Sequence, residues 1–89
     1  METIIYLKNL GLGNNVKAYN KTNLTSVDIF RNTSIDIQEF EDIEYLEERL
    51  GKDLSVKTDF THWQICSRKE FNEIAIEFGK NYNQLISEL

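Results

Sequence analysis

The first forty residues alternate apolar and polar positions in short runs, which is the pattern of β-strands. The runs TIIYLK (3–8) and VKAYN (16–20) flank the segment NLGLGNN, whose glycines and asparagines favour a tight turn. These two runs predict an antiparallel hairpin. Two further runs, SVDIFR (26–31) and SIDI (34–37), alternate in the same way and are joined at residues 32–33, which predicts a second hairpin.

From about Glu39 the spacing of apolar residues changes to the period of an amphipathic helix. The apolar side of this helix is predicted to collect Phe40, Ile43, Leu46 and Leu50. Gly51 follows directly, and glycine is the residue that a left-handed C-terminal cap prefers. The pattern therefore predicts a helix that ends at Leu50.

The run LSVKTDFTHWQIC (54–66) is rich in β-branched and aromatic residues, which predicts a further strand. Alternation along this run places Val56, Thr58 and Phe60 on the face opposite to Trp63 and Ile65. Trp63 suits either an anchor for a partner or the core, and in so small a protein a single tryptophan is more often a core residue. We therefore expect Trp63 to be buried.

A long amphipathic helix is predicted from Ser67 to the C-terminus. The motif SRKE (67–70) matches a capping box, in which the side chains of Ser67 and Glu70 each accept a hydrogen bond from the backbone N–H of the other. The apolar stripe of this helix consists of Phe71, Ile74, Ala75, Phe78, Tyr82, Leu85, Ile86 and Leu89. Gly79 lies inside the stripe and predicts a bend or a close neighbour.

The order of these elements, β-β-β-β-α-β-α, indicates an α+β fold. A chain of 89 residues is too short for two separate cores, so residues 1–89 are expected to form a single domain. We expect a mainly antiparallel sheet of four to five strands, packed on two helices that lie on one of its faces. The long amphipathic C-terminal helix would bury its apolar stripe against this sheet.

Acidic residues are concentrated in one segment of the chain. The net charge is −5, and residues 36–48 contain seven carboxylates and no basic residue, so the rest of the chain sums to +2. The seven are Asp36, Glu39, Glu41, Asp42, Glu44, Glu47 and Glu48. A net negative charge disfavours direct binding to nucleic acid or to an anionic membrane.

Several features favour a cytoplasmic protein. The single cysteine, Cys66, excludes an internal disulfide and suits a reducing compartment. No run approaches the ~18 apolar residues of a membrane span, and the N-terminal segment lacks the basic start and cleavage site of a signal peptide. The abundance of Asn, Ile and Lys, which have AT-rich codons, favours a low-GC bacterium or one of its phages or plasmids.

No motif for catalysis or for a cofactor stands out. The segment GLGNNV has Val16 where a dinucleotide-binding loop needs its third glycine, and a strand pattern follows it instead of a helix. On a strand, His62 and Cys66 would lie about 13 Å apart, which is too far for a base to reach the thiol. A zinc site would need two more ligands. We therefore predict no catalytic residue, no cofactor and no metal site.

The acidic segment is the strongest candidate for a binding surface. On the predicted helix, Glu41, Glu44 and Glu48 form a stripe with Tyr45 beside it. Glu44 and Glu48 repel each other, and of these acids only Glu48 has a lysine, Lys52, four residues later. A helix selected for stability alone would pair more of its acids, so this stripe is a candidate site for a basic partner.

Two interpretations of the segment remain open. A solvated helix face explains it in part, because the helix macrodipole favours acids in the first turn, and Asp36 and Glu39 fall at the strand-to-helix junction where carboxylates can cap. The other interpretation is an acidic binding surface whose carboxylates imitate the charges of nucleic acid. Short acidic inhibitors of nucleases, restriction enzymes or CRISPR effectors share this size and charge, which is an analogy of composition.

The sequence favours a small, acidic, non-enzymatic binding protein of a phage or mobile element. Such a protein would inhibit or modulate a basic, nucleic-acid-binding protein through Glu41, Glu44, Tyr45 and Glu48. The alternative is an assembly module that forms a homodimer through its C-terminal helix. In that case Ile76 and Asn83, on the uncharged second side of the helix, are the expected contacts. A third alternative is an enzyme that uses His62 with Cys66 or a carboxylate.

Overall fold

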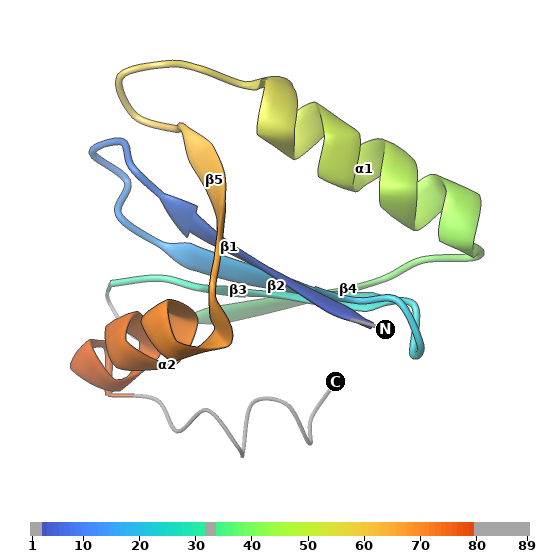
Figure 1. The fold of residues 1–89 in the computed structure, drawn as a ribbon, viewed down its shortest axis with the longest axis horizontal. Helices are drawn as coiled ribbons and strands as arrows, with labels where there is room; N and C mark the ends of the chain where they lie inside the picture. The colour runs from blue at the N-terminus through green and yellow to red at the C-terminus, as the bar shows by residue number, and fades with distance from the viewer. Residues whose placement is uncertain (1–2, 32–33, 80–89) are drawn as a thin grey trace.

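The strands form one antiparallel sheet in a computed structural model of the chain, which describes residues 3–31 and 34–79 (Figure 1). They are β1 (Ile4–Asn9), β2 (Val16–Asn20), β3 (Thr25–Ile29), β4 (Ile35–Glu39) and β5 (Trp63–Cys66). The order across the sheet is β4-β3-β2-β1-β5, so β4 and β5 form its two edges. The α+β class and the antiparallel pairing of both predicted hairpins are confirmed. The connection at residues 32–33 lies outside the described residues.

The two helices, α1 (Ile43–Ser55) and α2 (Arg68–Glu77), cover opposite faces of the sheet (Figure 1). The core on the α2 side consists of Tyr6, Val16, Ala18, Val27, Ile29, Phe71, Ala75 and Phe78. The core on the α1 side consists of Leu7, Tyr19, Phe40, Leu46 and Trp63. The prediction of two helices on one face is therefore wrong. Strands β2 and β3 are buried along their whole length, so each face of the sheet needs its own cover.

Helix α1 begins and ends later than predicted. Asp42 is its N-cap and accepts a hydrogen bond from the backbone N–H of Tyr45 at 2.9 Å. At its other end the helix continues past Gly51 to Ser55, because Leu54 extends the apolar side and packs on the α1-side core. Ile43, predicted as core, is 39% exposed.

Only the last four residues of the run 54–66 form a strand. Its first two residues complete α1, and the segment 56–62 is a loop closed by a β-bridge between Lys57 and His62. Trp63 is buried, as predicted, but Ile65 is 57% exposed because β5 is an edge strand. The prediction of a long strand is wrong because the apolar period of α1 extends into the run.

The start of α2 is confirmed and its predicted length is not. The Ser67 hydroxyl accepts a hydrogen bond from the backbone N–H of Glu70 at 3.1 Å, and Phe71 is fully buried. The helix ends at Glu77, and Gly79 has a φ of 81°, which terminates the helical conformation. The predicted stripe residues beyond this point, Tyr82, Leu85, Ile86 and Leu89, lie outside the described residues.

Replacing Gly51 by alanine tests the corrected end of α1. No atom lies within 4 Å of a Cβ built at Gly51, and alanine is favoured over glycine inside a helix. Gly51→Ala should therefore raise the free energy of unfolding by about 0.5–1 kcal/mol, measured by urea denaturation. Gly79→Ala is the control and should lower it by about 1 kcal/mol, because alanine is strained at a positive φ. A loss of stability in Gly51→Ala would contradict the helix bounds.

Candidate functional site

The acidic segment folds into an exposed surface that begins on an edge strand and continues onto a helix. All seven of its carboxylate residues are exposed, and we refer to them as the acidic surface: Asp36, Glu39, Glu41, Asp42, Glu44, Glu47 and Glu48. The first two lie on β4, the next two lie in the connection to α1, and the last three lie in the first turns of α1. The negative charge of this segment thus lies on β4, on the first turns of α1 and on the connection between them.

The helical part of this surface is smaller than predicted. Glu41 precedes the N-cap, so only Glu44 and Glu48 of the predicted stripe lie on α1. The assignment of Asp36 and Glu39 to capping is also wrong, because β4 continues through Glu39, which pairs with Thr25 of β3. Capping by Asp42, the first-turn position of Glu44 and the pairing of Glu48 with Lys52 therefore account for three of the seven carboxylates within the helix.

Tyr45 provides an aromatic side chain within the acidic surface. It is 55% exposed, and its ring centroid lies 6.1 Å from that of the buried Phe40. Among the described residues, the acidic surface forms one ion pair, between Glu48 and Lys52 at 3.6 Å, and both of these side chains are exposed. A pair of this kind contributes little stability. The acidic surface is therefore largely uncompensated, with an apolar side chain in its midst.

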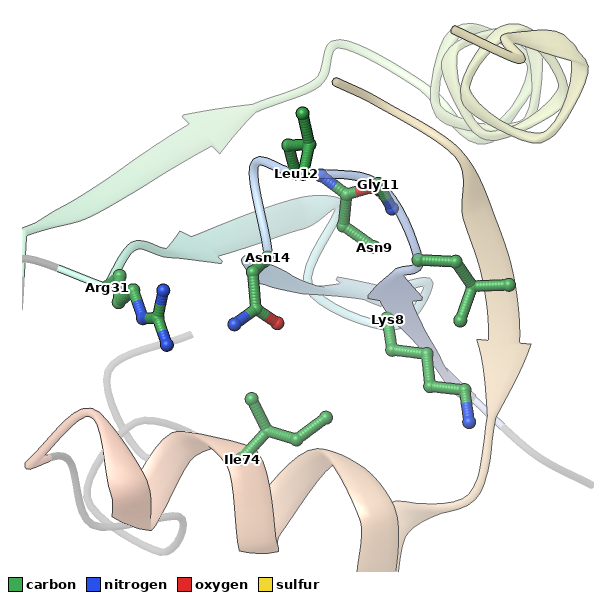
Figure 2. A pocket seen from close by; sticks show the side chains of 8 residues that line it. Lys8, Asn9, Gly11, Leu12, Asn14, Arg31 and Ile74 are labelled. Atoms are coloured by element: carbon green, nitrogen blue, oxygen red, sulfur yellow. Dashed lines mark hydrogen bonds between the residues drawn. The ribbon is translucent and has the colours of Figure 1, made fainter. Parts of the chain in front are cut away.

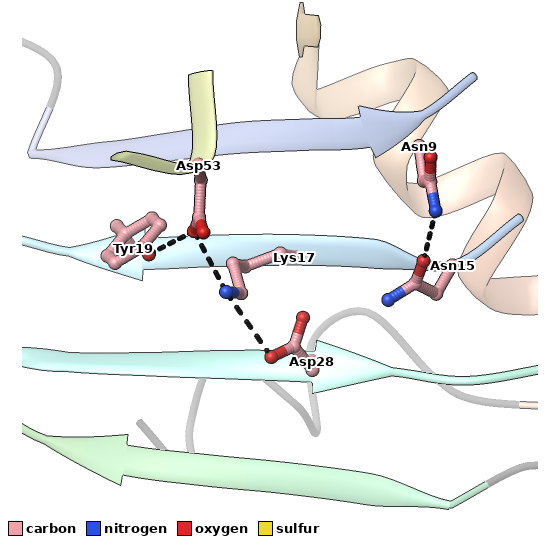
Figure 3. A network of polar contacts seen from close by, with 6 residues as sticks. All are labelled: Asn9, Asn15, Lys17, Tyr19, Asp28 and Asp53. Atoms are coloured by element: carbon pink, nitrogen blue, oxygen red, sulfur yellow. Dashed lines mark hydrogen bonds and ion pairs between the residues drawn. The ribbon is translucent and has the colours of Figure 1, made fainter. Parts of the chain in front are cut away.

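A buried ionic cluster attaches α1 to the sheet (Figure 3). Lys17 of β2 is only 5% exposed, and its Nζ lies 2.9 Å from Oδ2 of Asp53 on α1 and 3.5 Å from Oδ2 of Asp28 on β3. The Tyr19 hydroxyl donates a short hydrogen bond to the same Asp53 oxygen. The Lys17 Nζ also lies 5.5 Å from the ring centroid of Trp63. We refer to Lys17, Tyr19, Asp28 and Asp53 as the Lys17 cluster.

Burial shifts the pKa of two groups in the Lys17 cluster, Asp28 and Tyr19. It raises the pKa of Asp28 to about 6, and the neighbouring Lys17 opposes this increase. The Oδ1 atom of Asp28 is buried and has no hydrogen-bond partner among the described residues. Burial and the bond to Asp53 raise the pKa of Tyr19 above its usual range. The cluster was missed in the sequence because only the register, Lys17 opposite Asp28, brings these residues together.

An amphipathic pocket of about 470 Å³ lies between the β1–β2 loop and α2 (Figure 2). Its lining is Lys8, Asn9, Leu10, Gly11, Leu12, Asn14, Arg31 and Ile74. The ammonium group of Lys8 is paired with Glu70 at 2.6 Å, and this hydrogen bond raises the Lys8 pKa. Leu12 is 80% exposed at the rim. The pocket is therefore open, and one of its two cations is already neutralised.

The β1–β2 loop is fixed to the loop before β5 by Asn9. The Asn9 Oδ1 atom accepts hydrogen bonds from the backbone N–H groups of Gly11 and His62, both at 2.9 Å. Its Nδ2 atom donates to Asn15 Oδ1 at 2.8 Å and to the Phe60 carbonyl at 3.2 Å. The loop GLGNNV is thus a hairpin connection, as predicted.

His62 and Cys66 do not form a catalytic pair in this fold. The chain between them is the extended strand β5, which keeps residues four apart at about 13 Å. Cys66 is half-buried, and burial raises its pKa to about 11, so the thiol rather than the reactive thiolate is present at neutral pH. Across residues 3–31 and 34–79, no group of three or more His, Cys, Asp or Glu side chains is placed to hold a metal ion.

The predicted oligomer contact is only partly described. Ile76 is 58% exposed on α2, whereas Asn83 lies outside the described residues. A single exposed isoleucine is common on protein surfaces. No described helix is long and apolar enough to cross a membrane.

Comparisons with models of protein families, with curated proteins and with solved structures find no match to this chain. The acidic surface, the pocket and the Lys17 cluster therefore have to be weighed by exposure, charge and geometry. By these criteria the acidic surface is the candidate site. All of its acids are exposed, whereas the Lys17 cluster is buried and one of the two cations that line the pocket is already paired.

Removal of Asp53 should destabilise the protein more than removal of any exposed aspartate. In Asp53→Ala the buried Lys17 keeps only the longer contact to Asp28, and the Tyr19 hydroxyl loses its acceptor. We expect a loss of about 3 kcal/mol in the free energy of unfolding, measured by urea denaturation. The control, Asp59→Ala in the exposed loop, should change it by less than about 0.5 kcal/mol. Equal losses in the two variants would contradict the structural role of Asp53.

The raised pKa of Asp28 predicts a pH dependence of stability. The folded protein holds its proton more tightly than the unfolded chain, in which the pKa is near 3.8, so the free energy of unfolding should fall as the pH rises from 3.8 to about 6. The contribution of this residue is about 2–3 kcal/mol. In Asp28→Asn this part of the dependence should disappear. Parallel pH profiles for the two proteins, from thermal unfolding, would contradict the assignment.

Proposed function

We propose that this chain is a small non-enzymatic binding protein, whose acidic surface docks on a basic surface of another protein and inhibits or modulates it. The observation that carries the proposal is the exposure of all seven carboxylates, from β4 to the first turns of α1, with one exposed ion pair among them in the described part of the chain. Like charges held together cost stability, and a basic partner offsets that cost.

The spacing of the acids favours a nucleic-acid-binding groove as the partner surface. Glu44 and Glu48 are separated by about 6 Å along the helix axis, so several carboxylates fall within a Debye length of about 8 Å and act together on an approaching cation. Grooves that bind nucleic acid present lysine and arginine side chains to a closely spaced row of phosphates. An acidic helix beside an acidic strand offers such a groove an alternative ligand.

Tyr45 adds an aromatic contact to the acidic surface. Carboxylates that imitate only the charges of nucleic acid would not supply such a contact. Tyrosine is enriched among the residues that dominate interface energetics, and this one is more than half exposed. The charges would then steer the encounter and Tyr45 would slow dissociation. A nuclease or a host-defence effector in the bacterial cytoplasm is the partner class that fits this chemistry, and the AT-rich codon bias favours a phage or mobile element as the source of the inhibitor.

Charge reversal tests the proposal when it is compared with an equal reversal elsewhere. The variant Glu41→Lys, Glu44→Lys, Glu48→Lys should lose capture of a basic protein from bacterial lysate at low salt, with affinity for the purified partner reduced by about 100-fold. The control is Asp59→Lys, Glu73→Lys, Glu77→Lys, in which three other exposed acids are reversed. The control has the same net charge and should keep the partner. Equal capture by the two triple variants would sink the proposal.

A further inference from the structure

Strand β4 combines part of the acidic surface with an edge of the sheet on which no other described strand pairs. It is an edge strand and lies beyond β3 at the bottom of Figure 3, and its pairing with β3 is continuous over five residues, without a bulge. Natural edge strands are commonly protected by charged side chains, especially lysine, by proline or by a bulge. The charged side chains of β4, Asp36 and Glu39, are acidic and therefore repel acidic strands only. Within β4 there is neither a proline nor a lysine, and the whole chain contains no proline.

The register identifies which backbone groups face outward. The Phe40 N–H donates to the Leu24 carbonyl at 2.8 Å, and the Phe30 N–H donates to the Ser34 carbonyl at 3.0 Å. Hydrogen-bonded pairs alternate along an antiparallel ladder, so the even-numbered residues of β4 face β3. The N–H and C=O groups of the odd-numbered residues, Ile35, Ile37 and Glu39, therefore point away from the sheet.

The side chains of β4 place an apolar residue on one face of this edge and an acid on the other. Ile37 pairs with Val27 of the α2-side core but is itself 45% exposed, whereas Asp36 pairs with Asp28 on the α1 side and is exposed. A strand added to β4 would place its own side chains alternately beside Ile37 and beside Asp36. An apolar residue fits the first position and a cation fits the second.

The charge of the acidic surface selects among possible occupants of the edge. A second copy of this chain, paired through β4, would bring two sets of seven carboxylates together, and like charges across strands are destabilising. A cationic strand would instead be attracted, because every acid of the acidic surface is exposed. The edge therefore disfavours self-association and favours a basic extended segment.

We infer that β4 binds an extended segment of a partner protein by strand addition, and that this segment alternates basic and apolar residues. Main-chain hydrogen bonds to Ile35, Ile37 and Glu39 supply the pairing, and the acidic surface supplies the selectivity for cations. The inference rests on the proposed function and adds to it the mode of recognition. It requires that the partner present an extended basic strand beside the groove that receives the acids of α1.

A peptide that alternates lysine with valine over nine residues is the probe. In the wild-type protein at low salt, its addition should slow amide hydrogen exchange at Ile35, Ile37 and Glu39, whose N–H groups point away from β3. The matched controls are two N-methylated versions of the same peptide, one methylated at the odd-numbered backbone nitrogens and the other at the even-numbered ones. The version that lacks the N–H donors facing β4 should not bind, although its charge is unchanged.

The variant Ile37→Pro removes one outward N–H without removing a bond to β3. It should weaken peptide binding by about tenfold, whereas Ile37→Val, which keeps the N–H, should bind as wild type does. The exchange measurement on wild type needs no variant, so misfolding of Ile37→Pro leaves the test intact.

The remaining outcomes separate the inference from the proposed function. Binding of the peptide without slower exchange at the three amides would overturn strand addition and leave docking of the acidic surface in place. Slower exchange at these amides on raising the protein concentration alone would identify a second copy as the occupant and overturn the choice of a basic partner. Absence of peptide binding would also overturn the inference. Equal capture by the two triple charge variants would instead remove the proposed function.

Discussion

The position of α1 depends on one ammonium group buried between the helix and the sheet. Lys17 would be costly to bury alone, because a desolvated cation loses several kcal/mol of hydration free energy. Two aspartates from different elements, Asp28 on β3 and Asp53 on α1, offset that cost. The helix cannot shift along the sheet without separating Asp53 from Lys17 and Tyr19. An apolar contact would tolerate such a shift more readily, so the cluster fixes the register of the helix.

This constraint bears on the proposed function because α1 carries the helical part of the acidic surface. Asp53 lies in the last turns of the helix, and the exposed acids lie in its first turns. The like charges at the N-terminal end favour detachment of the helix, and the Lys17 cluster opposes it at the other end. A binding surface that is held in place pays less conformational entropy when a partner docks. Burial of a charged cluster is thus consistent with a need for a fixed surface.

The sequence predicted the features that depend on local pattern. Alternation located β1 to β4, the capping box located the start of α2, and the only tryptophan proved to be buried. Features that depend on tertiary context were missed. Lys17 lies at an alternating position that usually faces solvent, and only the pairing of β2 with β3 and the cover of α1 bury it. The same cover explains why both faces of the sheet are apolar.

The candidate site also has one feature that the sequence predicted and another that depends on tertiary context. The excess of acids in residues 36–48 is visible in the sequence, and all of them proved to be exposed. Their division between the strand and the helix was predicted wrongly beyond Asp36, because the helix was expected to begin near Glu39. The N-cap at Asp42 shortens the helix at its start and leaves Asp36 and Glu39 on an edge strand. The late start of α1 thus leaves two of the acids on an edge strand. The charge pattern alone does not reveal this.

Phe40 fixes the β4 part of the acidic surface relative to the α1 part. It follows β4 directly, its N–H donates to the Leu24 carbonyl, and its ring lies in the α1-side core with a centroid 6.0 Å from that of Tyr19. Tyr19 in turn donates to Asp53, so the edge strand and the helix are both tied to the Lys17 cluster. A partner that pairs with β4 therefore meets the acids of α1 at a fixed offset. Such an arrangement discriminates among basic partners by geometry as well as by charge, because a strand that is displaced or inclined gains the hydrogen bonds or the ion pairs but not both.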